Sequence, residues 1–311
     1  MKLINSSFEI LEQEPGLQGI YKQIELAGRT CYKSLDNITK DSAKDFVDRM
    51  IASQHYAMLE HGTVYLLFSE CCYSGSDREF IDKYTKNPYS KVVCIGTDDD
   101  LVEQTPSKED YLGDILDTGV CGNALYAITT NYRVLVENGW LNDLQYLCEP
   151  TEFHEKRVTV RFTTSNGIMR ELTRHRSHSF AVESTRYCNY SKEKFNNELT
   201  FVKPCCLNDE KLKLYGDYHT VIRDKSPESI FIANLNNVEK DYLDLIKLGW
   251  TPQQARQILP LSTKVQTIHT AFESDWAEFI SLRADACSGS VHPNMKVIAN
   301  KIMCLMAKTN A

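Results

Sequence analysis

A short stretch in the second half of the chain concentrates side chains that bind anions or exchange protons. It runs from Thr173 to Tyr187 and reads TRHRSHSFAVESTRY, with Arg174, His175 and Arg176 in a row. Guanidinium groups stay charged and donate hydrogen bonds in a rigid fork, whereas histidine titrates near neutral pH. The stretch therefore indicates a local site for an anionic ligand.

Two further arginines follow on segments with helical spacing. Arg283 lies seven residues after Trp276, on a stripe that also carries Phe279 and Ile280. A guanidinium on an apolar stripe needs an anion or several acceptors, because an unpaired buried charge is very costly. The plainer interpretation is a structural ion pair, or a side chain that reaches solvent at a helix end. Arg256, one turn into a short helix, allows the same two interpretations.

The other chemistry-bearing residues give weaker signals. No G-x-S-x-G motif surrounds Ser184, so the sequence favours a hydrogen-bonding role for it over a nucleophilic one. His55, Glu60 and His61 fit no strong zinc spacing, and we expect no metal site.

The eleven cysteines include no C-x-x-C pair and are interpreted as small, reduced core residues. Glycine-rich phosphate loops are absent from the sequence, so side chains must hold any nucleotide.

Composition limits the partners that the chain can attract. The 311 residues carry a formal net charge of −7, with 42% hydrophobic and 25% charged residues. This balance is typical of a soluble globular protein and disfavours general attraction to nucleic acid or an anionic membrane. The first residues lack the apolar core of a secretory signal, and no run is long enough to span a bilayer. We therefore expect a cytoplasmic protein whose anion site is a local cluster.

Helical and strand-like segments alternate irregularly along the chain, which favours an α+β fold over a doubly wound sheet. Strands are predicted over 63–68, 156–164 and 263–270. Helices are predicted over 20–34, 43–51, 129–147 with a break at Gly139, 168–175, 238–248 before a capping Gly249, 252–259 after a capping Thr251, from a capping Ser274, and from Pro293. This assignment puts the Arg-His-Arg run at or just past the end of a short helix.

The spacing of the central stretch matches a family signature. Arg174-His175-Arg176, seven residues and then Ser184 form the R-H-R-x7-S pattern, so the stretch resembles the flavin-dependent thymidylate synthases. Further segments resemble motifs of that family and occur in the family's order: AGRTCYKS (27–34), HYAMLEH (55–61), ARQILPLSTK (255–264), and LRADA and HP near Arg283 and His292. The resemblance covers both ends and the middle of the chain.

The resemblance implies an architecture and an activity. The architecture is a single α+β domain over residues 1–311, a mostly antiparallel sheet with flanking helices, and an inserted region at about 69–156. The implied reaction is reductive methylation of dUMP to dTMP, with 5,10-methylenetetrahydrofolate as the one-carbon donor and FAD, reduced by NADPH, as the hydride source. Members are homotetramers with active sites between subunits, and no nucleic acid polymer or membrane is an expected partner.

The resemblance also implies roles for individual residues. Arg283 takes the catalytic position, at the uracil edge, where a fixed positive charge favours loss of the N3 proton. The positions implied for dUMP binding are Glu171, Arg174, Glu183, Ser184, Arg186, Arg256 and Arg283. The positions implied for FAD binding are His55, Ala57, Glu60, Arg174, His175, Arg176, Ser177 and Glu278.

Two alternatives to this function stay open, and departures from the family pattern motivate the first. Val182 stands where many members carry Gln or Glu, Ala181 and Phe272 replace asparagines, and Glu278 stands where Asn or His is common. One alternative is therefore a related flavoenzyme that methylates or hydroxymethylates another pyrimidine nucleotide. The other is a binding protein that uses the Arg-His-Arg cluster on single-stranded nucleic acid, which the acidic net charge disfavours.

Overall fold

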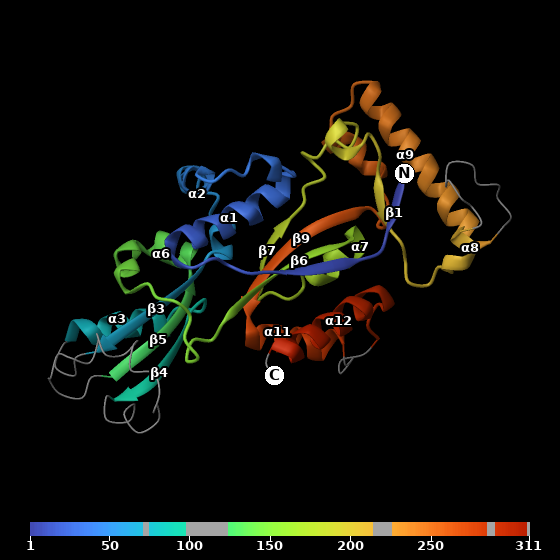
Figure 1. The fold of residues 1–311 in the computed structure, drawn as a ribbon. Helices are drawn as coiled ribbons and strands as arrows, with labels where there is room; N and C mark the ends of the chain where they lie inside the picture. The colour runs from blue at the N-terminus through green and yellow to red at the C-terminus, as the bar shows by residue number, and fades with distance from the viewer. Residues whose placement is uncertain (71–74, 98–123, 214–225, 285–289, 310–311) are drawn as a thin grey trace. The chain divides into compact units, whose positions relative to one another are not determined.

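The computed structural model describes residues 1–70, 75–97, 124–213, 226–284 and 290–309 (Figure 1). The chain divides into two compact units. The first unit contains Met1–Leu11, Ala27–Asn37 and Thr159–Ala311, and the second contains Glu12–Leu26 and Ile38–Val158. Each unit has its own sheet and its own buried residues, and each is described by itself.

The first unit is built on a four-stranded sheet in the order β2-β6-β9-β7. Its strands are β2 (Ser7–Leu11), β6 (Arg157–Ser165), β9 (Lys264–Phe272) and β7 (Ser179–Val182). β2 runs antiparallel to β6, and β7 runs antiparallel to β9. The alternation that predicted a strand in β6 turns Val160 and Phe162 into the core, where both are fully buried. A parallel pair, β1 (Lys2–Ile4) and β8 (Thr200–Val202), completes the strands described in this unit.

Helices cover the first unit's strands with apolar faces. They are α7 (Asn166–Leu172), α8 (Asp209–Lys213), α9 (Pro227–Lys247), α10 (Pro252–Ala255), α11 (Glu273–Arg283) and α12 (Pro293–Thr309), with 3-10 turns η1 (Leu35–Asn37), η4 (Glu193–Phe195) and η5 (Arg256–Ile258). Trp276 of α11 packs against Phe162, with ring centroids 6.2 Å apart. α9 buries Leu235 and Tyr242 in a separate cluster that includes Phe201 of β8. The sheet and α11 together hold the segment around the Arg-His-Arg run.

The second unit has a three-stranded antiparallel sheet in the order β3-β5-β4. Its elements are β3 (Thr63–Glu70), β4 (Lys91–Thr97), β5 (Ala124–Asn131), α2 (Ser42–Ala52), α3 (Gly75–Thr85), α6 (Tyr132–Asn138), η2 (Tyr56–His61) and η3 (Leu141–Tyr146). α1 (Gly16–Tyr32) begins in this unit, and its last turns belong to the first unit. The region expected to be an insertion, 69–156, lies within the second unit, and its status as an insertion stays a prediction.

The predicted α+β class is confirmed, since antiparallel pairs dominate both larger sheets and helices flank the first. None of the helices in the described ranges has the length and apolar character needed to cross a membrane. Gly249 follows α9 with φ of 96°, a conformation that suits glycine, and so confirms the predicted end of that helix. Gln254 accepts a hydrogen bond from the Thr251 backbone N–H at 2.9 Å, which confirms the predicted start of α10.

Two element predictions were wrong in part. Residues 129–131 were assigned to a helix, but they end β5; the Asn131 side chain accepts a hydrogen bond from the Val134 N–H and starts α6 at Tyr132. The break at Gly139 is confirmed by its φ of 71°. Ser274 was assigned as a helix cap, but α11 already begins at Glu273, so the serine lies inside the first turn.

Candidate functional site

The Arg-His-Arg run forms a turn directly after α7. The Ser165 side chain accepts a hydrogen bond from the Ile168 N–H at 3.3 Å and fixes the start of this short helix. α7 ends at Leu172, and the backbone N–H groups of Arg174 and His175 close the last turn with distances of 3.2 and 3.3 Å. The predicted place of the run, just past a helix end, is confirmed. The side chains of Arg174 and Arg176 are exposed, so their charges are accessible to a ligand.

Arg283, at the end of α11, meets this turn. Its Nε donates to His175 Nε2 at 3.0 Å, and its Nη2 donates to the Glu171 carbonyl oxygen at 3.4 Å. The Glu171 carboxylate is 3.8 Å from Arg283 Nη1, so this ion pair is a loose one. The side chain of Arg283 is 22% exposed, whereas Trp276 and Phe279 of the same helix are buried. The arginine therefore lies at the rim of the apolar stripe, with a neutral ring and a carboxylate beside it.

His175 is held as a neutral imidazole. Burial, followed by the positive charge of Arg283 and the neighbouring His178, lowers the pKa of His175 to about 4. Because Nε2 accepts a hydrogen bond from Arg283, the ring proton must lie on Nδ1. Phe279 packs against the ring edge-on, with centroids 4.8 Å apart, and fixes its orientation. The residue can therefore offer one N–H donor without carrying a charge.

The segment around Ser184 is anchored on both of its sides by backbone hydrogen bonds. It follows β7, where Val182 pairs with Thr267 of β9. The Glu183 N–H donates to the Gln266 carbonyl at 2.7 Å, and the Ser184 N–H donates to the Cys31 carbonyl at 2.8 Å. These bonds hold the backbone rigidly while the Ser184 side chain remains half-exposed.

Two arginines contact this segment through neutral partners. Arg186 Nη2 donates to Gln253 Oε1 at 3.3 Å, and Arg256 Nη1 donates to Thr185 Oγ1 at 3.2 Å. Throughout the part of the chain that the structure describes, neither guanidinium forms an ion pair with a carboxylate. No carboxylate of the described residues thus neutralises their charges, and an anion near Ser184 would find two strong donors.

Glu183 occupies a different environment from the neighbouring serine. Its carboxylate has no exposed surface and accepts hydrogen bonds from Lys264 Nζ at 2.9 and 3.1 Å. It also accepts from the Gln266 N–H at 2.9 Å and the Tyr190 hydroxyl at 3.2 Å, and Lys33 Nζ lies 3.4 Å away. These contacts give Glu183 a structural role in the interior, and its predicted contact with dUMP stays a prediction.

Two thiols lie next to this carboxylate. Burial raises the pKa of Cys31 to about 11, and the negative charge of Glu183 acts in the same direction. Burial and then Glu183 raise the pKa of Cys188 to about 11 as well. Both side chains are therefore neutral thiols at physiological pH and take no part in anion binding.

The remaining predicted positions are reported unit by unit. In the second unit, His55 and Ala57 are exposed at η2, while Glu60 pairs with Arg133 and its carbonyl accepts from Arg157 Nη1 at 2.9 Å. In the first unit, Ser177 is exposed after the Arg-His-Arg run, and Glu278 is exposed on α11. The FAD contacts implied for these residues stay predictions.

Several residues of the site were missed by reasoning from the sequence. Lys33 and Lys264 fall inside the motif-like segments CYKS and STK, but nothing in their spacing indicated that they would share one carboxylate. Thr185 and Gln253 were not assigned either, although each is adjacent to an assigned or capping position. Neutral residues that orient arginines carry little sequence signal, because many residue types provide the same acceptor.

Comparison with known proteins places these residues in a family context. The model of the family described as thymidylate synthase complementing protein matches residues 131–309, which is more than half of the 311 residues. A flavin-dependent thymidylate synthase from Halobacterium salinarum is 28% identical over 128 residues, covering 39% of this chain and 52% of that protein. A second from Haloarcula marismortui is 28% identical over 110 residues, covering 33% and 44%. The chain thus matches about half the length of these curated relatives.

Two solved structures resemble the chain more distantly. A UMP/dUMP methylase from Streptomyces cacaoi bound with 5-Br dUMP has a TM-score of 0.40 and 14% identity, covering 99% of this chain and 93% of that one. Thymidylate synthase X from Helicobacter pylori, with FAD and dUMP, has a TM-score of 0.36 and 14% identity, covering 96% and 91%. At these TM-scores, the likeness supports no conclusion about fold or ligands.

Proposed function

The chain belongs to the thymidylate synthase complementing protein family, and from that premise we propose that it is a flavin-dependent thymidylate synthase. The reaction is the reductive methylation of dUMP to dTMP, with 5,10-methylenetetrahydrofolate as one-carbon donor, FAD as cofactor and NADPH as reductant. The two relatives that are 28% identical carry the same activity in their names, which supports the proposal.

One observation in particular supports a nucleotide phosphate as the ligand. Arg186 and Arg256 both contact the segment around Ser184, and among the described residues both donate to neutral side-chain oxygens and to no carboxylate. A phosphate group offers the charged, multiply accepting partner that these guanidinium forks lack. The Ser184 hydroxyl, next to Thr185, then adds a neutral donor to the same phosphate.

Arg283 and His175 fit the pyrimidine end of such a substrate. The guanidinium pairs only loosely with Glu171, whose carboxylate oxygen is 3.8 Å away, so much of its charge can act on a ligand. A fixed positive charge in a partly dry site stabilises negative charge that develops on a ring during reaction. Arg283 would thereby favour loss of the uracil N3 proton, and Glu171 would contact the same ring.

The residues of the Arg-His-Arg turn fit a flavin dinucleotide. Arg174 and Arg176 expose charged forks suited to a pyrophosphate, and Ser177 adds a hydroxyl. His175 offers a neutral N–H donor on Nδ1, which suits an uncharged heterocycle better than an imidazolium would. When bound, FAD supplies the hydride that completes the methyl group, while these residues orient it and dUMP.

A direct assay tests the proposal. Purified protein is incubated with FAD, NADPH, methylenetetrahydrofolate and dUMP, and the products are separated by chromatography. We expect dTMP to form, and the flavin absorbance spectrum to change when dUMP is added. Protein that cannot be reconstituted with FAD, or that makes no dTMP, would contradict the proposal. A parallel reaction with dCMP tests whether another pyrimidine nucleotide is the true substrate.

We further propose that the chain is one functional domain with an insertion at about 69–156, and that it works as a homotetramer. In the family, subunits complete each other's sites. Arg186 and Arg256 form no ion pair with a described carboxylate and Arg283 forms only a loose one, which is consistent with a site shared between subunits. Sedimentation velocity of the purified protein checks the assembly state. A stable monomer with full activity would refute it.

A further inference from the structure

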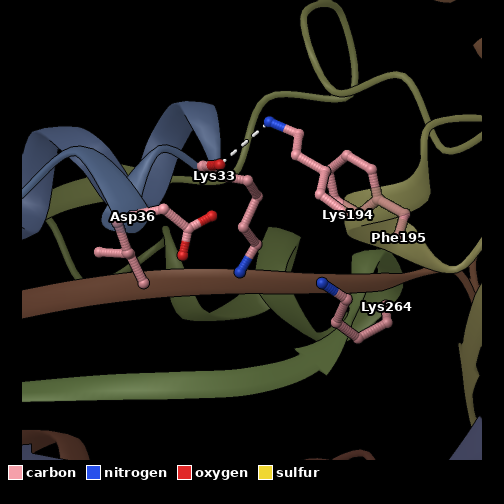
Figure 2. Close-up of a pocket in the computed structure, with 6 residues that line it drawn as sticks. Lys33, Asp36, Lys194, Phe195 and Lys264 are labelled. Atoms are coloured by element: carbon pink, nitrogen blue, oxygen red, sulfur yellow. Dashed lines mark hydrogen bonds between the residues drawn. The ribbon is translucent and has the colours of Figure 1, made fainter.

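A cavity in the first unit collects three lysines that none of the predicted site positions includes. Its volume is about 260 Å³, and Figure 2 shows the side chains that line it. The lining residues are Lys33, Leu35, Asp36, Lys194, Phe195 and Lys264. They come from the stretch 33–36 after α1, which includes η1, from η4 and from β9, so three separate segments contribute to one small space.

The lysine ammonium groups keep hydrogen-bonding capacity for a ligand. Lys33 Nζ lies 3.4 Å from Glu183 and also donates to Gln266 Oε1. Lys264 Nζ donates to the two carboxylate oxygens of Glu183, and Lys194 Nζ donates to the Lys33 carbonyl at 3.1 Å. Each ammonium group has three N–H donors, so the described residues leave at least one donor available on every lysine.

The charges around the cavity do not cancel. Three lysines face two carboxylates, the buried Glu183 and the lining Asp36, which leaves a local excess of one positive charge. The chain as a whole carries −7, so this excess is a local feature and not a general one. Burial, reinforced by the charge of Lys264, lowers the pKa of Lys33 to about 8. An anion in the cavity would relieve this unfavourable environment.

The backbone at Lys33 is in a conformation that lysine rarely adopts. Its φ is 51°, in the left-handed region that favours glycine or asparagine, directly after the end of α1. The Ser34 N–H closes the helix end on the Arg29 carbonyl at 3.0 Å, so the conformation is fixed by the fold. Strained residues of this kind concentrate at functional sites, and here the strained residue carries a largely buried cation, with 15% of its side chain exposed.

We propose that this cavity binds the phosphate group of a small phosphomonoester. The ammonium groups of Lys33, Lys194 and Lys264 contact the phosphate oxygens, and the Asp36 carboxylate accepts from a hydroxyl group of the ligand. Phe195 and Leu35 cover the apolar part of the same molecule. The proposal does not depend on the function proposed above, because it uses none of the arginines around Ser184.

Phosphate binding by exposed-lysine variants tests the proposal. Inorganic phosphate is the probe, and its dissociation constant is measured by equilibrium dialysis on the full chain at about 0.15 M ionic strength, where distant exposed charges are largely screened. Lys194→Glu removes one ligand and reverses its charge, and we expect the affinity to fall about tenfold. Lys192→Glu is the matched control, since Lys192 is an exposed lysine two residues away that does not line the cavity. It should change the affinity less than about twofold.

A third variant separates this site from the arginines. Arg256→Ala should leave phosphate binding at the cavity in place and Lys194→Glu should still weaken it in that background. Equal affinities in Lys194→Glu and Lys192→Glu would overturn the proposal. So would the loss of all phosphate binding in Arg256→Ala alone. Formation of dTMP is scored separately, so failure of the proposed enzymatic function and failure of this site are distinguishable.

Lys33→Gly provides a variant whose backbone is relaxed rather than strained. Glycine suits a φ of 51°, and Glu183 retains Lys264, the Gln266 N–H and the Tyr190 hydroxyl as partners. We expect a folded protein with about tenfold weaker phosphate affinity. An unchanged affinity in this folded variant would overturn the role of Lys33 and with it the proposed site.

The pH dependence of anion binding gives an independent readout. Lys33 faces Glu183, Lys264 and the neutral thiol of Cys188, with Lys194 at its carbonyl and Asp36 on the cavity wall. Since Lys33 loses its proton as the pH rises through about 8, affinity should fall between pH 7 and 9. Sulfate is the probe, because its charge does not change over this range. The fall should be smaller in Lys33→Gly, and an identical fall in both proteins would contradict the assignment.

Discussion

The short segment Glu183–Thr185 lies between two pairs of cations that have different partners within the protein. On one side, Arg186 and Arg256 donate to the neutral oxygens of Gln253 and Thr185. On the other side, Lys33 and Lys264 contact the buried carboxylate of Glu183. The arginine charges can therefore act on an external anion. In contrast, the Glu183 carboxylate neutralises one of the two lysine charges inside the protein. Within this segment, Glu183 therefore anchors the backbone in the interior, whereas Ser184 lies on the side of the two arginines and of the proposed phosphate.

The largest expected effect, on stability, comes from the variant Glu183→Ala, which tests the lysine side of this comparison. Glu183→Ala leaves Lys33 and Lys264 close together without their shared carboxylate. Removing one partner of a buried ion pair costs about 3 to 5 kcal/mol, and we expect a loss of that order in the free energy of unfolding. Chemical denaturation of the variant and the wild type measures it.

Glu193→Ala is the matched control for this change. Glu193 is exposed, so its removal should change the free energy of unfolding by less than about 0.5 kcal/mol. If Glu183→Ala were as mild as Glu193→Ala, the carboxylate would not be the anchor of the segment.

Arg283→Ala should have the next largest effect, and on turnover rather than on folding. The arginine is paired only loosely with Glu171 and donates to a neutral ring, so its charge is free to act on substrate. We expect kcat/KM for dUMP to fall by about 100- to 1,000-fold, the usual cost of removing one group that stabilises developing charge.

The control for Arg283 is Arg170→Ala, which removes an exposed arginine from α7 and should leave activity within about twofold. Steady-state kinetics and thermal unfolding are measured on both variants. An Arg283→Ala protein that unfolds readily, yet remains fully active while folded, would assign this arginine to structure alone.

The variant Arg256→Ala tests the arginine side of the comparison, namely whether Arg256 binds the phosphate of dUMP. One charged donor to the proposed nucleotide phosphate is lost, which is worth about 1.5 to 3 kcal/mol. We expect KM for dUMP to rise by about 10- to 100-fold with a smaller change in kcat. Arg161→Ala serves for comparison, because Arg161 pairs with Glu9 on the sheet at 2.5 Å and is not a predicted ligand. Similar KM values for the two variants would argue against phosphate binding by Arg256.

The smallest expected effect concerns the charge state of His175. Its pKa is about 4 in the folded protein and near 6.5 in an unfolded chain, so the unfolded chain takes up the proton first as pH falls. Stability from this residue is complete above pH 6.5 and is lost as the pH falls toward 4. Allowing for partial exposure, the loss is about 1 to 2 kcal/mol.

The wild type should therefore lose more stability than His175→Gln between pH 6.5 and 4.5. Denaturant titrations at the two pH values give the difference. Equal losses in both proteins would mean that His175 titrates normally, and that Arg283 does not keep it neutral.

Local sequence signals predicted a good part of the fold. The helix ends at Thr251 and Gly249, the alternating strand β6 and the position of the Arg-His-Arg turn follow from capping, φ preference and periodicity, which depend on neighbouring residues. Strand β7 was not predicted, because four residues contain too little periodicity to reveal a strand.

The charge pairs of the site could not be predicted from the sequence for a different reason. Arg283 and His175 are 108 residues apart, and Lys264 and Glu183 are 81 residues apart. Such pairs depend on the register of β7 against β9 and on where α1 ends, and neither leaves a pattern in the residues themselves. The family motifs indicated which arginines would be functional, but not that a buried glutamate would support them.

The raised pKa values of the Cys31 and Cys188 thiols have a practical consequence. Maleimides and other alkylating reagents attack the thiolate form, which these two cysteines hardly populate at neutral pH. Among the described cysteines, Cys94, Cys205, Cys206 and Cys304 are exposed, contrary to the predicted core location, so a fluorophore or spin label would attach to them before Cys31 or Cys188. Spectroscopic probes can therefore be introduced into the natural sequence while the interior beneath Ser184 stays chemically untouched.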